Sequence, residues 1–401
     1  YMMIVFSAAG QQRQTLVQTL TRILQEEVDS SRIPGAVLQV KYNGKLIYTR
    51  AAGYASLYDT SGQRLAIPES MTTDHLFDIA SLTKVTGTTT AIMLLTDEGK
   101  LHLDDPVGKF IPAFNSPDKK AITIRNLITH TAGLYEWYPL YYRASDAKAT
   151  YELIGSLPLK YPVGAGRHYS DLGFIILGQI IETVSGESLE EFETRHIFLP
   201  LGMKHTLYNP ERKQYPGPVA STSHGNPFEY RMVHDSSMGY VFKEINPDQW
   251  NGWRHYTLHG EVNDGNSWYA CEGVNGAAGL FSTVEDLQKL VDMLMNNGVA
   301  DGKPFIRPET IRLFLTKDTF NNGLGWMMDP DNSFMKNAPA GSFGHTGFTG
   351  TSIAVVPSRK LSVILLINRQ NTGLLPSKEY YNPNAFRRKV FETVMQFVNN
   401  K

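Results

Sequence analysis

A serine and a lysine stand three residues apart at the start of an apolar segment, as Ser81 and Lys84. The run from Ala91 to Leu95 that follows is typical of a buried helix. Because residues i and i+3 lie on one face of a helix, the Ser81 hydroxyl and the Lys84 amine can meet. A serine hydroxyl is a poor nucleophile until a base takes its proton. We therefore predict a serine nucleophile with a lysine activator, and we expect burial and the helix dipole to lower the lysine pKa.

The Ser-x-x-Lys spacing alone is a weak signal. It recurs in three polar segments, at residues 116–119, 145–148 and 333–336, none of which leads into a long apolar helix. For Ser81 the structural alternative is a serine that caps the N-terminus of a core helix. Further motifs are needed to decide between a nucleophile and a cap.

Two more short motifs carry groups that could take part in the same chemistry. Tyr169-Ser170-Asp171 offers a phenol whose pKa a nearby ammonium would lower toward use as a base. His345-Thr346-Gly347 precedes the last two predicted strands, and a glycine-rich strand edge can offer a backbone N–H to an oxyanion. The sequence has no Gly-x-Ser-x-Gly elbow, no His-Glu-x-x-His and no phosphate loop, so three common rival classes of enzyme lose support.

Composition narrows the possible partners. The 401 residues hold 38 Lys plus Arg against 39 Asp plus Glu, and this balance argues against a nucleic-acid or anionic-membrane partner. The single cysteine, Cys271, excludes an intrachain disulfide and any multi-cysteine metal site. No apolar run approaches the length of a membrane span. We predict a monomer without metal or cofactor that acts on a small molecule or a short peptide.

The order of predicted elements places these motifs in one architecture. A helix at residues 12–29, an Asn43-Gly44 hairpin, strands at 352–356 and 361–368 and a helix at 384–398 suggest an antiparallel sheet built from both chain ends. We predict a mixed α/β fold in which residues 12–75 and 276–401 form the sheet part and residues 76–275 a largely helical insertion. Within the insertion we expect a helix at 175–184 and a lid-like loop at about 210–275, and after it a capping box of Ser282 with Glu285. The short apolar start resembles the tail of a secretory signal, so residues 1–11 are interpreted as a leader remnant or a disordered terminus of an extracytoplasmic protein.

The three motifs, in this order, resemble those of the serine β-lactamase and penicillin-binding-protein superfamily: Ser-x-x-Lys, then Tyr-x-Asn or Ser-x-Asn, then Lys/His-Thr/Ser-Gly. The likeness is greatest to the branch of class C β-lactamases, D-alanyl-D-alanine carboxypeptidases and related esterases, and it extends from about Ile23 to Val398. Flanking segments that are similar to the family lie at residues 33–36, 129–134, 200–203 and 275–282.

The resemblance implies a role for each matching residue. Ser81 would be the acylated nucleophile, Lys84 its proton partner and Tyr169 the phenolic base. The backbone N–H groups of Ser81 and Phe348 would form the oxyanion hole. His345, Thr346 and Gly347 would line the pocket and contact a carboxylate or carbonyl of the substrate.

The sequence departs from the best-known family pattern at two positions, and both concern the substrate. Asp171 stands where lactamases have Asn, and a carboxylate cannot donate to an acylamino side chain, so efficient β-lactam turnover is in doubt. His345 replaces Lys, and a neutral imidazole attracts a carboxylate less than an ammonium does. The aromatic cluster that includes Tyr135 and Trp137 is either a packed loop or a substrate wall.

These features leave two kinds of function open. The favoured one is a serine hydrolase that acts through an acyl-enzyme on an ester, amide or D-amino-acid peptide. The alternatives are a class C-type β-lactamase and a penicillin-binding relative that is acylated without efficient turnover.

Overall fold

The computed structural model of the chain describes residues 8–400, with side chains from residue 11 onward. The segment interpreted as a leader remnant or a disordered terminus comprises residues 1–11. Residues 1–7 of it lie outside the described residues, and residues 8–11 belong to helix α1 (Ala8–Asp29).

A six-stranded antiparallel sheet has the strand order β3-β2-β1-β11-β10-β9. Its strands are β1 (Gly35–Tyr42), β2 (Lys45–Tyr58), β3 (Arg64–Ser70), β9 (Phe343–Thr346), β10 (Ser352–Val356) and β11 (Leu361–Ile367). The first and last strands of the chain lie beside each other, with Ala36 opposite Ile367. The predicted mixed fold, with one sheet built from both chain ends, is confirmed.

The hairpin between β1 and β2 turns where the sequence predicts. Asn43 and Gly44 both have positive φ, at 49° and 73°. Two such residues form the turn whose twist matches that of paired strands, which is why Asn-Gly is favoured there.

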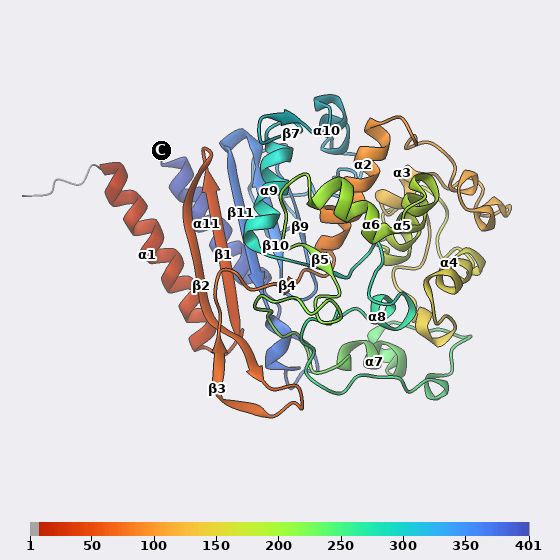
Figure 1. Cartoon of the computed structure of the whole chain (residues 1–401), viewed down its shortest axis with the longest axis horizontal. Coiled ribbons are helices and arrows are strands. Elements are labelled where there is room, and N and C mark those ends of the chain that lie inside the picture. The colour runs from red at the N-terminus through yellow and green to blue at the C-terminus, as the bar shows by residue number, and fades with distance from the viewer. Residues whose placement is uncertain (1–7, 401) are drawn as a thin grey trace, which may run out of the picture.

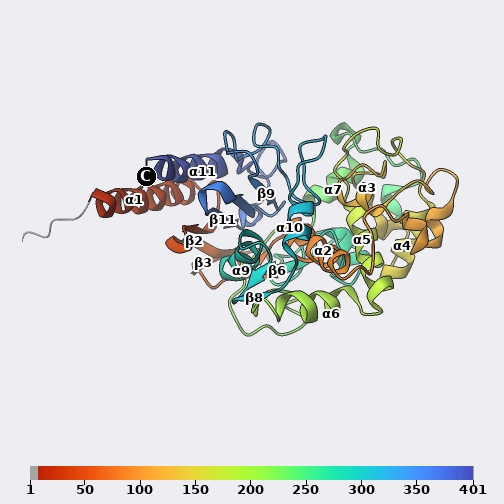
Figure 2. The same cartoon turned by 90° about the horizontal axis from the view of Figure 1, so that it is seen from above.

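Two helices from opposite ends of the chain cover one face of the sheet. α1 and α11 (Asn384–Asn399) lie side by side (Figures 1 and 2) and bury Leu20 and Ile23 of α1 and Val390 and Val394 of α11 against the strands. Both predicted terminal helices are therefore confirmed.

The other face of the sheet packs against α9 (Val284–Met295) and the helical part of the molecule (Figure 1). All seven residues of β11 are buried. A strand covered on both faces reads as a continuous apolar run, as residues 361–367 do.

The helical part is connected through a short three-stranded sheet whose strands come before, among and after its helices. That sheet has the order β4-β6-β5 and comprises β4 (Phe77–Asp78), β5 (Leu207–Tyr208) and β6 (Leu280–Ser282). The helices are α2 (Thr89–Asp97), α3 (Ile124–Ile128), α4 (Ala147–Ser156), α5 (Asp171–Ser185), α6 (Leu189–Glu193), α7 (Pro227–His234) and α8 (Gly265–Ala270). α10 (Pro308–Phe314) and the hairpin of β7 (Val299–Ala300) and β8 (Lys303–Pro304) come later in the chain. The domain boundaries at residues 75 and 276 stay a prediction.

Three local predictions need correction. The helix expected at 175–184 begins at Asp171, because the Ser170 hydroxyl accepts from Gly173 N and caps it there. The cap of α9 is Thr283, which accepts from Asp286 N, and not Ser282 with Glu285. The segment at 210–275 contains α7 and α8 and contributes Met232, Ile245 and Trp253 to the main core, so it is more than a polar loop.

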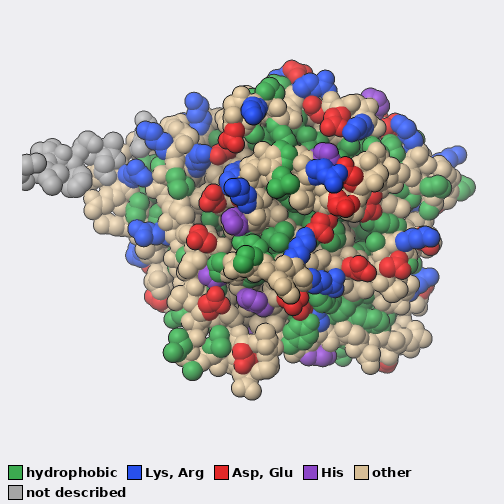
Figure 3. All heavy atoms as spheres, viewed as in Figure 1, with side chains coloured by type: hydrophobic (Ala, Val, Ile, Leu, Met, Phe, Trp, Pro, Cys, Tyr) green, Lys and Arg blue, Asp and Glu red, His purple; other side chains and the backbone are tan. Residues whose placement is uncertain are grey.

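Among the described helices, none alone is long and apolar enough to cross a membrane. The pair Asp171–Ser185 and Leu189–Phe198 passes that test of length and composition together, but it is bent by 75°. Charged side chains of both signs are interspersed over the face seen in Figure 3.

Candidate active site

The turn before Ser81 is held in an uncommon conformation. Ala80 has a φ of 45°, in the left-handed region that costs a residue with a Cβ on the order of 1 to 3 kcal/mol. The buried Asp78 carboxylate accepts from Ala80 N at 2.8 Å and from Asn263 N at 2.6 Å. Burial raises the pKa of Asp78 to about 6, against the effect of these two hydrogen bonds. Asp78 thus fixes the turn that places Ser81 at the start of the following helix.

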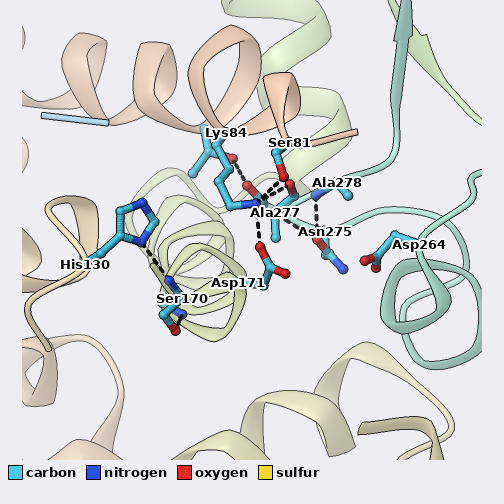
Figure 4. A network of polar contacts seen from close by, with 12 residues as sticks. Ser81, Lys84, His130, Ser170, Asp171, Asp264, Asn275, Ala277 and Ala278 are labelled. Atoms are coloured by element: carbon cyan, nitrogen blue, oxygen red, sulfur yellow. Dashed lines mark hydrogen bonds and ion pairs between the residues drawn. The ribbon is translucent and has the colours of Figure 1, made fainter. Parts of the chain in front are cut away.

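Lys84 lies directly below Ser81 and contacts three oxygens. Its Nζ donates to Ser81 Oγ at 3.1 Å and to the Ala277 carbonyl at 2.9 Å, and it forms an ion pair with Asp171 Oδ1 at 2.6 Å (Figure 4). Burial alone would lower the lysine pKa, but Asp171 and Tyr169 outweigh it, so the pKa of Lys84 is raised. The expectation of a lowered pKa was wrong because the sequence did not show that Asp171 pairs with the lysine.

A loop from the sheet part supplies one of these oxygens. The Asn275 side chain accepts from Ala277 N at 2.8 Å and from Ala278 N at 3.0 Å (Figure 4). These bonds shape the turn that points the Ala277 carbonyl at Lys84. These hydrogen bonds give a physical role to the segment at residues 275–282, which the sequence analysis singled out only because it is similar to the family.

Tyr169 completes the cluster around Ser81. Lys84 Nζ lies 5.1 Å from the centroid of the Tyr169 ring, and the Tyr169 hydroxyl interacts with Ser81 and Lys84. Burial and the Asp171 charge raise the pKa of Tyr169 more than Lys84 lowers it. The phenol is therefore protonated at neutral pH, contrary to the lowered pKa that the sequence suggested.

The His130 ring packs against the Tyr169 ring. The two ring centroids are 4.4 Å apart, and His130 Nδ1 accepts from Ser170 N at 3.0 Å. Burial lowers the pKa of His130 well below its usual range, so the ring is neutral. His130 is therefore interpreted as a structural residue that holds Tyr169 in place.

Strand β9 brings the third motif to the site. His345 is buried, its Nδ1 donates to Thr346 O at 2.9 Å, and burial lowers its pKa to about 3. Gly347 must be a glycine, because a Cβ there would come within 2.1 Å of Thr351 Oγ1 and 2.5 Å of Ile79 O. Because Gly347 has no side chain, the backbone after β9 can pass close to Ile79, between strand β4 and Ser81.

The geometry leaves two amide groups available at the cavity. Within residues 8–400 the N–H groups of Ser81 and Phe348 donate to no oxygen of the protein. Arg387 donates to Gly347 O at 3.2 Å and to Thr351 O at 2.9 Å, and Arg369 donates to Phe348 O at 2.9 Å. These arginines fix the segment that carries the Phe348 amide, as a preorganised oxyanion hole requires.

A cavity of about 810 Å³ opens above these groups. The predicted site residues that line it are Ser81, Trp137, Tyr169, Asp171, His345, Thr346, Gly347 and Phe348. Tyr135 does not line it and packs edge-on against Tyr138, with ring centroids 5.9 Å apart. Only the Trp137 end of the predicted aromatic wall therefore reaches the cavity.

The structure adds site residues that the sequence did not reveal. Arg167, Glu229, Tyr240, Asn263 and Asp264 line the cavity. Four of these belong to the segment at 210–275, which the sequence analysis expected to be a lid-like loop. That expectation did not single out any residue within the segment. Burial raises the pKa of Glu229 to about 8.

No cluster of metal-ligating side chains occurs among residues 8–400. Cys271 is buried, and burial raises the pKa of its thiol to about 12.

Comparison with known proteins places most of the chain in one family. The family model described as Beta-lactamase matches residues 20–383. The N-acetylmuramyl-L-alanine amidase of Bacillus subtilis (strain 168) is 32% identical over 382 residues, which cover 90% of this chain and 82% of that protein. A protein of Escherichia coli (strain K12), provisionally named a D-alanyl-D-alanine carboxypeptidase, is 31% identical over 388 residues, 92% of this chain and 85% of that protein.

The fold is also that of a solved structure. The octameric penicillin-binding protein homologue from Pyrococcus abyssi superimposes with a TM-score of 0.68 at 22% identity, over 96% of this chain and 77% of that chain. With the Ser81, Tyr169 and His345 motifs gathered at one cavity, these matches show that the chain belongs to the beta-lactamase family of hydrolases, within the superfamily of serine β-lactamases and penicillin-binding proteins.

Proposed function

We propose that the protein is a serine hydrolase in which Ser81 forms an acyl-enzyme with an ester, an amide or a D-amino-acid peptide. The observation that carries the proposal is the contact of 3.1 Å between the buried Lys84 Nζ and Oγ of Ser81, a residue that lines the cavity. The two unused amides of Ser81 and Phe348 support it, because they can bind the oxyanion of a tetrahedral intermediate.

The charge states indicate which group acts as the base. Lys84 is an ammonium paired with Asp171, so it cannot accept the Ser81 proton. The phenolate form of Tyr169 accepts that proton while Ser81 Oγ attacks the carbonyl carbon. Tyr169 then returns the proton to the leaving group as the bond to the acyl carbon breaks. In the second half, Tyr169 takes a proton from the water that attacks the ester on Ser81, and it gives that proton to Ser81 Oγ as the acyl–oxygen bond breaks. Because the pKa of Tyr169 is raised, the rate should increase with pH on the alkaline side of neutrality.

The substrate class follows from the relatives and from Asp171. The names of the two curated relatives refer to an amidase and a carboxypeptidase, which favours amide or D-amino-acid peptide bonds. The Asp171 carboxylate has no N–H to donate to the side chain of a β-lactam, and one of its oxygens already pairs with Lys84. We therefore expect higher kcat/KM for esters and small peptides than for cephalosporins. A chromogenic cephalosporin that outperforms every ester would contradict this.

The test is the mass of the intact protein over time after addition of a fluorophosphonate, a penicillin or an activated ester. A transient ester-derived adduct on Ser81 supports a hydrolase, whereas a stable penicillin adduct without turnover supports the penicillin-binding alternative. Ser81→Ala should abolish both adduct and turnover and leave the melting temperature nearly unchanged. Parent-level turnover in that variant would show that Ser81 is not the nucleophile.

The extracytoplasmic location and the monomeric state belong to the same proposal. Peptidase activity on cell-wall peptides would need an extracytoplasmic location, and cell fractionation with compartment markers would test that location. Light scattering on the purified protein would test the second, since the Pyrococcus homologue is octameric.

A further inference from the structure

A second cavity, of about 650 Å³, lies between the hairpin of β1 and β2, the helix α9 and the segments on either side of β5. Among residues 8–400, none lines both this cavity and the one that contains Ser81. Its volume is within the range of sites that hold small molecules, roughly 300 to 1,000 Å³. The second cavity is therefore a candidate binding site separate from the catalytic one.

Two glutamine side chains that line this cavity are almost fully buried. Gln39 and Gln288 each have 5% of their surface exposed. Gln288 Nε2 donates to Asp292 Oδ1 at 3.0 Å. The Gln39 amide makes only long contacts, to Thr49 Oγ1 at 3.3 Å, to Val284 O at 3.3 Å and to Gln288 Oε1 at 3.5 Å. Since strong N–H···O bonds are about 2.7 to 3.2 Å long, the Gln39 amide can bond a further group that enters the cavity.

The charged side chains of the second cavity are largely paired with one another. Lys41 Nζ lies 2.5 Å from Asp292 Oδ2, and Lys289 Nζ lies 3.3 Å from Glu285 Oε1. Asp74 adds one further carboxylate to the lining. An ionic ligand would therefore meet little free charge, whereas the paired groups still offer N–H donors and carboxylate lone pairs to a neutral ligand.

A ligand that suits this lining must both donate and accept hydrogen bonds. A hydroxyl group does so, because it carries one O–H donor and two acceptor lone pairs. The amides of Gln39 and Gln288 and the carboxylate of Asp292 present donors and acceptors that neighbouring hydroxyls can use together. Tyr215 and Leu46 also line the cavity and offer apolar surface to the C–H groups of a ring.

We propose that the second cavity is a binding site for a neutral saccharide, separate from the catalytic cavity. The contacts that run from Thr49 through Gln39 and Gln288 to Asp292 bond the sugar hydroxyls, and Tyr215 packs against the sugar ring. This site does not depend on the proposed function, since its residues lie outside the cavity that contains Ser81.

The experiment measures binding by saturation-transfer NMR and isothermal titration. The probes are cellobiose, maltose and N,N′-diacetylchitobiose, with citrate and spermidine as anionic and cationic comparison ligands. The proteins are wild type, Gln288→Leu, Tyr215→Leu and Gln25→Leu. Gln25 is a matched control because it makes the same helical i,i+4 bond, to Asp29 Oδ1 at 2.7 Å, on α1 and outside the cavity. The melting temperature reports whether each variant is folded.

We expect at least one of the three saccharides to bind wild-type protein, and Gln288→Leu to weaken that binding by about tenfold or more, because two hydrogen bonds to hydroxyls are lost. Tyr215→Leu should also weaken it, and this variant decides the test if Gln288→Leu does not fold. Gln25→Leu should bind as wild type does.

Three outcomes would overturn the proposal. The first is that none of the three saccharides binds, or that folded Gln288→Leu and Tyr215→Leu bind them as tightly as wild type. The second is tighter binding of citrate or spermidine than of any saccharide, which would exclude a neutral ligand. The third is displacement of the saccharide by a fluorophosphonate that labels Ser81, which would place the sugar in the catalytic cavity.

Discussion

Two buried ionisable side chains, Lys84 and Glu193, flank the same helical turn and reach opposite charge states. Lys84 begins a π-helical turn that ends at Thr88, and Glu193 faces Gly87 within that turn. Both side chains are fully buried. Lys84 has an anion 2.6 Å away in Asp171, whereas the one hydrogen-bond partner of the Glu193 carboxylate among residues 8–400 is the Tyr208 hydroxyl, at 2.9 Å. The pKa of Lys84 is raised, which keeps it charged, and burial raises the pKa of Glu193 to about 8, which keeps it neutral at pH 7.

The difference shows that burial does not by itself decide the charge of a group. Burial penalises the ion in both cases, and at Lys84 the ion pair with Asp171, together with the contact to Tyr169, reverses the outcome. Glu193 instead fills space: a Cβ on Gly87 would come within 2.4 Å of its carboxylate oxygens. Lys84, which contacts Ser81, therefore keeps its charge, whereas Glu193, which packs against Gly87 of the same turn, is neutral.

Replacing each group by an uncharged side chain of similar size should give the largest contrast. Lys84→Met should lower kcat/KM on an activated ester by on the order of 10³-fold or more, because Tyr169 and Ser81 lose their cation. Glu193→Gln should keep kcat/KM within about twofold, since Glu193 is already neutral. Steady-state kinetics at pH 8 on one ester would measure both. Equal losses in the two variants would show that the turn as a whole, and not the Lys84 charge, supports catalysis.

The ion pair itself can be neutralised from the other side. In Asp171→Asn the negative charge that raises the pKa of Tyr169 and of Lys84 is removed, so both groups should lose their protons at lower pH. We expect the alkaline rise in kcat/KM to move down by about one pH unit or more, with some loss of stability from the unpaired ammonium. The pH–rate profile on a neutral ester measures the shift.

Asp264→Asn provides the matched control for this shift. Asp264 also lines the cavity but forms no ion pair with Lys84, and Asn can keep its cap on Ser267 N. A smaller displacement of the pH profile is expected for this variant. If both variants move the profile equally, the general negative potential of the cavity is responsible, and the contact of 2.6 Å is not.

The sequence predicted the sheet from both chain ends, because the periodicity of apolar residues is visible along the chain. The gathering of the Ser81, Tyr169 and His345 motifs at one site was predicted from their resemblance to the family's motifs. The sequence could not predict the charge states. The pKa of Lys84 depends on an oxygen of Asp171 that is 87 positions away in the chain, and the pKa of Glu193 on the absence of any such partner. Arg167 was missed for the same reason, since its place on the cavity wall is recognisable only once its neighbours in space are known.

The neutral state of Glu193 has a consequence for stability. The folded protein holds its proton up to about pH 8, whereas an unfolded glutamate releases it near pH 4.5. Between these values the folded state binds more protons, so this contribution to stability is complete below pH 4.5 and is lost as the pH rises toward 8. Glu193→Gln should therefore flatten the decline in the free energy of unfolding between pH 5 and 8 by about 3 kcal/mol. Denaturant titrations at several pH values would measure it, and parallel curves for parent and variant would contradict a buried protonated Glu193.

The smallest expected effect comes from restoring a charge at residue 345. The pKa of His345 is about 3, so the parent ring is neutral throughout the working range of the enzyme. The His345 and Tyr169 ring centroids are 6.1 Å apart, and His345→Lys would add an ammonium to a region that already holds the charges of Lys84, Arg167 and Arg387. These like charges and the burial oppose it, so we expect a lower melting temperature and a gain of only about fivefold, or ~1 kcal/mol, for a carboxylate-bearing over a neutral leaving group. The base limb should also move to lower pH, because a second cation favours the phenolate. Profiles for parent and variant on both esters would test this, and if neither the profile nor the ratio changes, residue 345 does not influence the reacting centre.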